Sequence, residues 1–139
     1  MSTLSAALAT ALQNYGTVGD QVTKVLSGRD FKLQDAALET LPYSCISVVD
    51  LPSRETPFLG GGNGTETGQI EIRVISKVGE GKAKDIMNDI KAYLRETSSL
   101  SWDGSTIPLH ITGWGQVPDT FDDFSAWIEI LTIDYKNVV

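Results

Sequence analysis

Hydrophobic positions along the chain follow two spacings, and each spacing predicts one kind of element. Near the N-terminus the apolar residues repeat as one face of an amphipathic helix does, at Leu4, Leu8, Ala11, Leu12 and Tyr15. Gly16 follows, where a helix end favours a residue that tolerates positive φ. A longer helical stripe lies between Glu80 and Glu96, at Ala83, Ile86, Met87, Ile90, Tyr93 and Leu94. The pattern predicts an N-terminal helix and a long central helix.

Four other segments have the pattern of β-strands. Ser44 to Asp50 is rich in β-branched residues, and Gln69 to Ser76 alternates between apolar and polar positions. Ile107 to Ile111 also alternates, but Pro108 cannot donate a hydrogen bond, which places this strand at a sheet edge. Phe124 to Lys136 is the last and longest strand.

The remaining segments show weaker patterns. Val22 to Leu26 is consistent with a short helix that ends at Gly28, and Asp35 to Leu41 with another helical turn. Leu51 to Gly68 contains two prolines and five glycines, and Gly113 to Asp123 is expected to be a second loop. Because long loops in compact domains are usually functional or mobile, we expect a long mobile loop at about residues 52–68.

These elements predict a single α+β domain over residues 1–139, with a four-stranded, largely antiparallel sheet. The N-terminal helix and the long helix are expected to pack on one face. The closing strand is apolar on both faces: one carries Ala126, Ile128 and Ile130, the other Trp127, Leu131, Ile133 and Tyr135. Since two helices cover only one face, the second apolar stripe predicts self-association.

Composition narrows the classes of protein. The chain has 139 residues and a formal net charge of -7, which argues against affinity for nucleic acid through phosphate neutralisation. No apolar run is long enough to span a membrane, and residues 1–15 lack the basic region of a signal peptide. The single cysteine, Cys45, excludes an internal disulfide framework. A soluble protein made in a reducing compartment fits these features.

The candidate chemical groups favour structural interpretations. The one histidine, His110, has no second histidine or cysteine near it, so a surface role is favoured over a base or a metal ligand. Cys45 lies in an apolar strand and is expected to be a buried, unreactive thiol rather than a nucleophile. The glycine run Gly60 to Gly64 lacks the lysine of a phosphate loop and leads into a strand, which favours a flexible loop.

The acidic and aromatic residues also favour structural roles over chemical ones. Asp119, Asp122 and Asp123 could hold a divalent cation, but a solvated turn is favoured because no further ligand is implied by the spacing. The tryptophans are not interleaved with cations, so core and interface packing is favoured over base stacking; they are Trp102, Trp114 and Trp127. We expect no enzyme, no metal and no cofactor.

The order of the segments carries a further signal. The N-terminal helix is followed by a strand entered through Leu41-Pro42-Tyr43, then by the long loop and by QIEIRVISKVGEGKAKDIMNDIKAYL, residues 69–94. A short strand from Asp103 to Ile111 and an apolar closing strand from Trp127 to Tyr135 complete the series. In this order the segments resemble the tail terminator (tail completion) proteins of long-tailed bacteriophages, over nearly the whole chain.

The resemblance implies a structural virion protein at the junction of tail and neck, assembled in the host cytoplasm. Such proteins form a ring, expected to be hexameric, that caps the head-proximal end of the tail tube and stops its polymerisation. The implied partners are further copies of the chain, the tail tube protein, a neck or connector protein and, in a contractile tail, the sheath. DNA would pass through the lumen without specific binding, and an acidic wall would repel its phosphates.

Assembly contacts are expected in the long loop, at the acidic turn and on the closing strand. The candidate contact residues are Arg54, Gly61, Asn63, Asp119, Asp122, Asp123, Trp127 and Tyr135. Two alternatives stay open. One is another neck or head-to-tail connector protein, and the other is a small-molecule binding α+β module that uses the Gly60 loop as a lid.

Overall fold

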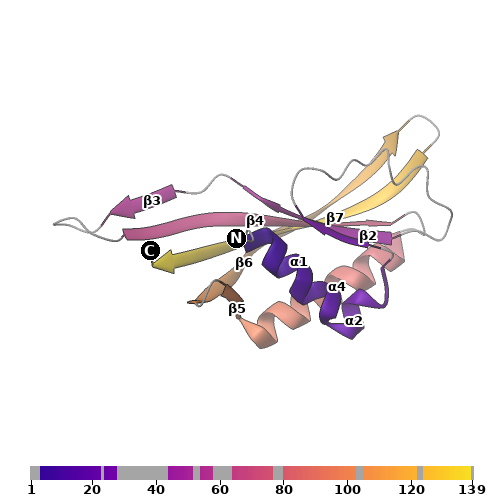
Figure 1. Ribbon diagram of the computed structural model, residues 1–139. Helices are drawn as coiled ribbons and strands as arrows, with labels where there is room; N and C mark the ends of the chain where they lie inside the picture. Colours follow the sequence, from indigo (N-terminus) through magenta and orange to yellow (C-terminus); the bar gives the residue numbers. More distant parts are fainter. Residues whose placement is uncertain are drawn as a thin grey trace.

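Helices lie on one face of a curled sheet, which makes the fold α+β as predicted (Figure 1). The computed structural model describes residues 4–22, 24–27, 44–51, 54–57, 64–76, 80–102, 105–121 and 124–138. The helices are α1 (Leu4–Asn14), α2 (Gly16–Gly19) and α4 (Glu80–Thr97). Both long helices were predicted, because their apolar stripes are the residues that become buried.

The sheet has seven strands in the described residues, not the four that the sequence predicts. Their order is β1-β2-β4-β7-β6-β5, and β3 pairs with β4 outside this path. Their bounds are β1 (Lys24–Ser27), β2 (Ser44–Asp50), β3 (Arg54–Pro57), β4 (Gly64–Ser76), β5 (Ser99–Trp102), β6 (Ser105–Phe121) and β7 (Phe124–Val138). Every pairing is antiparallel except that of β1 with β2, which is parallel.

Strand β1 corrects the short helix expected at Val22 to Leu26. Lys24 to Ser27 pairs in register with Cys45 to Val48 of β2. A helix this short is unstable alone, whereas pairing with β2 gives its backbone groups partners. The helical turn expected at Asp35 to Leu41 lies outside the described residues.

Both expected loops are in part strands, which is a second correction. In the segment 52–68, β3 pairs with Gly64 to Thr67. In the segment 113–123, β6 continues to Phe121 and pairs with β7 along its length from Leu109. Glycine and proline interrupt the strand pattern in both segments, so pairing with neighbouring strands decides their conformation.

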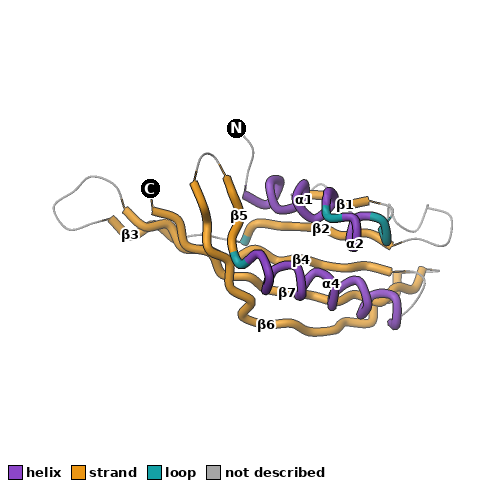
Figure 2. The backbone as a smooth tube through the Cα atoms, turned by 90° about the horizontal axis from the view of Figure 1, so that it is seen from below, coloured by secondary structure: helices purple, strands orange, loops and turns teal. Residues whose placement is uncertain are grey.

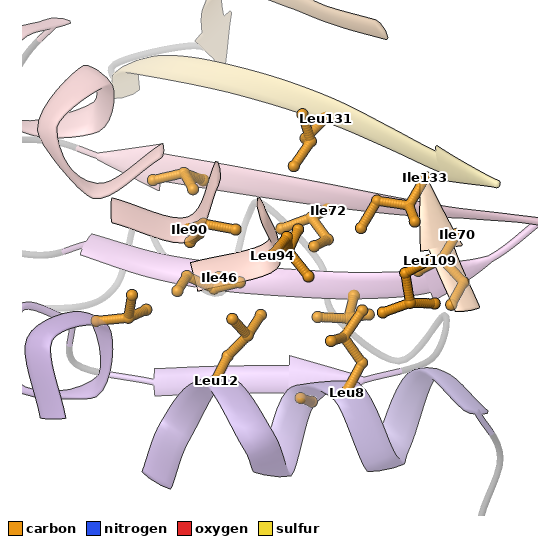
Figure 3. Close-up of a cluster of buried hydrophobic side chains, with 14 of the residues drawn as sticks. Leu8, Leu12, Ile46, Ile70, Ile72, Ile90, Leu94, Leu109, Leu131 and Ile133 are labelled. Carbon is orange, nitrogen blue, oxygen red and sulfur yellow. The ribbon is translucent and has the colours of Figure 1, made fainter. Parts of the chain in front are cut away.

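The core fills the space between the helices and the sheet (Figure 3). α1 packs on β1 and β2 and also contacts β5, whereas α4 packs on β4, β7 and β6 (Figure 2). The fully buried side chains with the largest volumes are Leu8, Leu12, Val18, Ile46, Ile70, Ile72, Ile86, Ile90, Ile107, Leu131 and Ile133. The two sides of the molecule are therefore different: α1 lies toward the β1 edge, and α4 lies toward β6.

Polar and aromatic contacts join the segment around α2 to the long helix α4. The rings of Tyr15 and Tyr93 stack with their centroids 4.7 Å apart. Gln21 Nε2 donates to Asp89 Oδ2 over 2.6 Å, and Lys82 Nζ donates to Gln21 Oε1 over 3.3 Å. These contacts fix the position of α2 against α4.

Candidate assembly surfaces

Trp114 is the exposed large hydrophobic side chain of the described residues, with 63% of its surface accessible. It lies on β6 beside α4, and Lys91 Nζ is 4.6 Å from the centroid of its ring. Gly113 and Gly115 flank it and face the opposite side of the sheet, where a Cβ at either position would meet no atom within 4 Å. The indole itself is exposed and has a cation on one side.

A β-bulge explains why Trp114 lies on the helix-covered face. The register of β6 against β7 shifts between Ile111 and Gly113. Ile111 pairs with Ile133 and Trp114 pairs with Leu131, although strict alternation would put residues three positions apart on opposite faces. The bulge moves the tryptophan from the far face of the sheet to the side of α4.

Within the described ranges the outer edge of β6 has no strand partner after Pro108, and the N–H of Leu109 still donates to the carbonyl of Ser98 over 3.1 Å. β5 covers only Ser105 to Pro108, so the edge position predicted for this strand is confirmed for part of its length. Residues 105–121 contain no lysine, arginine or glutamate, but they include Pro118 and the bulge between Ile111 and Gly113, and prolines and bulges limit the pairing of an edge with another strand.

The opposite lateral edge is formed by β1, with α1 and α2 beside it (Figure 2). Asp20 is the one charged residue in the segment 4–22, and Lys24 begins β1. On the other side, Lys91 and Arg95 lie one turn apart on the β6 side of α4, and in the described part of the chain neither has a carboxylate partner.

The far face of the sheet is polar toward one end. Asp134 pairs in register with Gln69 and with His110, and its Oδ1 accepts a 2.9 Å hydrogen bond from Gln69 Nε2. Arg73 Nε lies 2.7 Å from Glu71 Oε1. A shallow hollow lies at this end, lined by Thr67, Gly68, Gln69, His110, Asp134, Tyr135 and Lys136. His110 is exposed, as its surface role requires.

Toward the other end the far face is apolar, and it corrects the expected open stripe. Ile128 of β7 pairs with Ile75 of β4, and these side chains are only 4% and 2% exposed within a single chain. Ile130 is half-buried. A second copy is not needed to cover Ile128, so self-association has to rest on other surfaces.

The structure places the predicted contact residues in different environments. Tyr135 is buried in the core with 6% exposure, which excludes it as a surface contact in this fold. Its position on β7 puts it on the face under the helices, opposite Gly68 and Leu109. In the backbone Arg54 pairs with Thr67, Asp119 with Ala126, and Trp127 with Ser76 and Pro118. Four residues lie outside the described ranges, namely Gly61, Asn63, Asp122 and Asp123.

Sequence reasoning missed two features of this region. Trp114 was assigned to packing without separating it from the other tryptophans, although its glycine neighbours and the broken alternation after Ile111 were visible signals. Glu129 of β7 is 4% exposed, and its charge contributes to raising the pKa of Lys84. No pattern in the sequence marks this glutamate as buried.

The described ranges contain no group of three or more His, Cys, Asp or Glu side chains that could hold a metal ion. Among the helices of these ranges, none combines the length and the apolar character needed to cross a membrane. The side chain of Cys45 is not among those described, so its predicted burial stays a prediction.

Comparison with known proteins identifies the fold. No protein-family model matches the chain, and no curated protein sequence matches it. A solved structure of the virion of a native gene transfer agent particle contains a similar chain, with a TM-score of 0.64 and 13% identity over 98% of this chain and 95% of that one. A second solved structure matches with a TM-score of 0.53 and 15% identity, over 99% and 97% of the two chains. The fold is thus shared along the whole length of both neighbours.

Proposed function

We propose that this chain is a structural virion protein that forms a ring at the head-proximal end of a phage-like tail tube. The observation that carries the proposal is the similarity, over nearly the whole of both chains, to a chain of a gene transfer agent virion. The order of segments, which resembles that of tail terminators, supports the same role. In this role the chain acts by binding and has no catalytic residues.

Two surfaces support assembly into a ring. The open edge of β6 and the α1–β1 edge lie on opposite sides of one sheet. A contact between two different surfaces repeats from copy to copy and closes when the rotation allows it. The tube protein, the neck protein and, where present, the sheath would bind the two rims of such a ring, and DNA would pass through its lumen.

Electron microscopy tests the proposal. Negatively stained samples of the purified protein, alone and mixed with the tube protein, should show rings of six subunits that cap one end of each tube. Tubes polymerised with the protein should be shorter than tubes polymerised without it. Featureless particles that leave tube ends bare and tube lengths unchanged would contradict the role.

Another neck or head-to-tail connector protein is the second candidate, because the similarity is to a chain of a virion and does not by itself say at which junction that chain lies. The binding partner separates the two candidates. A terminator binds the end of the tail tube, whereas a connector binds the portal side of the head. Co-sedimentation with tubes and with tailless heads would distinguish them.

A further inference from the structure

We propose that Trp114, Lys91 and Arg95 bind an acidic segment of a partner protein, whose carboxylates meet the two cations and whose apolar side chain packs on the indole. These three residues are called the Trp114 strip. The inference rests on the proposed role in a virion and names the chemistry of one contact that this role requires. Because Trp114 lies on the helix side of β6, the outer edge of the strand is left for a neighbouring copy.

The strip is formed where the second half of α4 runs beside β6 (Figure 2). Lys91 Nζ lies 4.6 Å from the centroid of the Trp114 ring. Further along, the N–H of Leu109 donates to the carbonyl of Ser98, the residue that follows the helix. Arg95 comes four residues after Lys91, so it lies one turn further on the same side of the helix. Both cations therefore border β6 between Leu109 and Trp114.

The exposure of Trp114 marks the strip as a binding surface. The indole keeps 63% of its surface accessible although Lys91 lies over its ring, and among the described residues it is the large hydrophobic side chain that is exposed. Contact between so much apolar surface and water is unfavourable. Tryptophan is also one of the residues that most often dominate the binding energy of a protein interface. An apolar side chain of the partner would cover this surface.

Charge selects an acidic occupant. Lys84 lies on the same side of α4 two turns before Lys91, and it already pairs with Glu80. Lys91 and Arg95 have no carboxylate partner within the described residues, although the whole chain has a net charge of -7. Carboxylates of a partner would supply what these cations lack, and a guanidinium can donate two parallel hydrogen bonds to one carboxylate.

The other sides of α4 favour a short protein segment over a nucleic acid. Asp85, Asp89 and Glu96 are not spaced to share the side of Lys91 and Arg95, but the helix is only about 10 Å across. This width is comparable to the Debye length at physiological ionic strength, so the three carboxylates act on any ligand of the strip. A phosphate backbone repeats its charge along its whole length and would be repelled, whereas a segment with two or three carboxylates needs only the two cations.

A defined peptide tests the chemistry of the occupant. The probe is a fluorescein-labelled peptide in which a leucine is flanked on each side by aspartates, and its counterpart has asparagine in place of each aspartate. Fluorescence anisotropy should show saturable binding of the aspartate peptide to the wild-type protein. Its affinity should fall about threefold or more between about 0.01 M and about 0.15 M ionic strength, because the Debye length shortens from about 30 Å to about 8 Å. Equal affinity for the two peptides, or no binding of either, would overturn the inference.

Two lysines of the same helix form a matched pair of variants for locating the binding site. Lys91→Gln removes a cation of the strip and should weaken binding of the aspartate peptide about threefold to fivefold. Lys82→Gln removes the same charge from the α2 side, where Lys82 Nζ donates to Gln21 Oε1, and should bind as the wild type does. Trp114→Ala should weaken binding about tenfold or more, whereas Trp114→Phe should retain most of it. Circular dichroism checks that each variant is folded, and equal affinities of the two lysine variants would contradict the assignment.

Other occupants of the strip give different results. If a fluorescein-labelled oligothymidine bound the wild-type protein more tightly than the aspartate peptide and lost this binding in Trp114→Ala, the strip would be a nucleic-acid site. If sedimentation velocity showed that the wild-type protein assembles alone and that folded Trp114→Ala protein does not, the occupant would be a second copy. Either result would overturn the inference.

These measurements separate the inference from the proposed function. If wild-type rings cap tubes but the aspartate peptide does not bind, the function stands and the inference fails. If the peptide binds through the Trp114 strip but tube ends stay bare, the strip stands and the terminator function fails.

Discussion

Ser5 Oγ donates a 2.7 Å hydrogen bond to Asp50 Oδ2, which joins the first turn of α1 to the last residue of β2. Ser5 is 1% exposed, and Asp50 Oδ1 is buried with no hydrogen-bond partner. The carboxylate is therefore satisfied on one oxygen only. Because an underpaired carboxylate is costly, loss of this bond should weaken the docking of α1.

Ser5→Ala should lower the free energy of unfolding by about 1–3 kcal/mol, since it removes the hydrogen bond of a part-buried carboxylate whose other oxygen already has none. Thr10→Ala is the matched control, because its hydroxyl bonds only to the carbonyl of Ala6 on the exposed side of the same helix. The control should change stability by no more than about 0.5 kcal/mol. Urea unfolding followed by circular dichroism measures both values, and equal values would remove the role of the bond.

Gly19 lies where α2 comes close to the end of α1, and there is no room for a side chain at this position. A Cβ at this position would lie 2.1 Å from the carbonyl oxygen of Gln13, which is backbone and cannot swing away. Gly19→Ala should destabilise the protein by about 1–3 kcal/mol. Gly81→Ala is the control, because a Cβ there meets nothing within 4 Å and the first turn of α4 gains a better helix former. Thermal melts should order the proteins as Gly81→Ala at or above wild type, then Gly19→Ala below it.

Truncation of Tyr135 should destabilise the fold much more than truncation of Trp114, although tryptophan is the larger and more apolar side chain. Tyr135→Ala removes a side chain that is 6% exposed and should cost about 3–5 kcal/mol of unfolding free energy. Trp114→Ala removes a side chain that is mostly in water and should change monomer stability by about 0.5 kcal/mol or less. Chemical denaturation at a protein concentration below assembly compares the two. A large loss from Trp114→Ala would mean that the indole supports the fold itself.

The predictable part of the fold is the part with strong periodicity. α1, α4, β2 and β7 follow from apolar residues at helical or alternating spacing, because burial of one face selects both the element and its register. β1, β3 and the ends of β4 and β6 carry glycine, proline and polar residues. Their strand conformation comes from pairing, as where Thr65 to Thr67 lies between β3 and β7, and local sequence carries little information about pairing.

The candidate surface was harder to predict than the fold. One bulge residue near Thr112 decides on which face Trp114 lies, and alternation counted along the sequence gives the opposite face. The closing strand shows the same limit. Tyr135 and Ile128 have the composition of interface residues, but a single chain buries both, because neighbouring strands and helices cover them.

Lys84 gives the protein a dependence on alkaline pH. Its hydrogen bond with Glu80 raises the pKa of the ammonium group above 10.5; desolvation opposes this shift, and the charges of Glu80 and Glu129 add to it. A pKa that is higher in the folded state means that the folded chain holds this proton more tightly than the unfolded one. The stabilisation is therefore complete below about pH 10.5 and is lost as the pH rises through the folded value.

Lys84→Gln removes the titrating group, so the difference in unfolding free energy between wild type and this variant should be constant from about pH 7 to pH 9.5 and shrink above that range. Lys91→Gln is the control, because its ammonium group has no carboxylate partner in the described chain. Urea titrations at a series of pH values measure the difference. The effect should be small because the ion pair is exposed to solvent. A difference that grows with pH would show that the ion pair of Lys84 with Glu80 does not stabilise the fold.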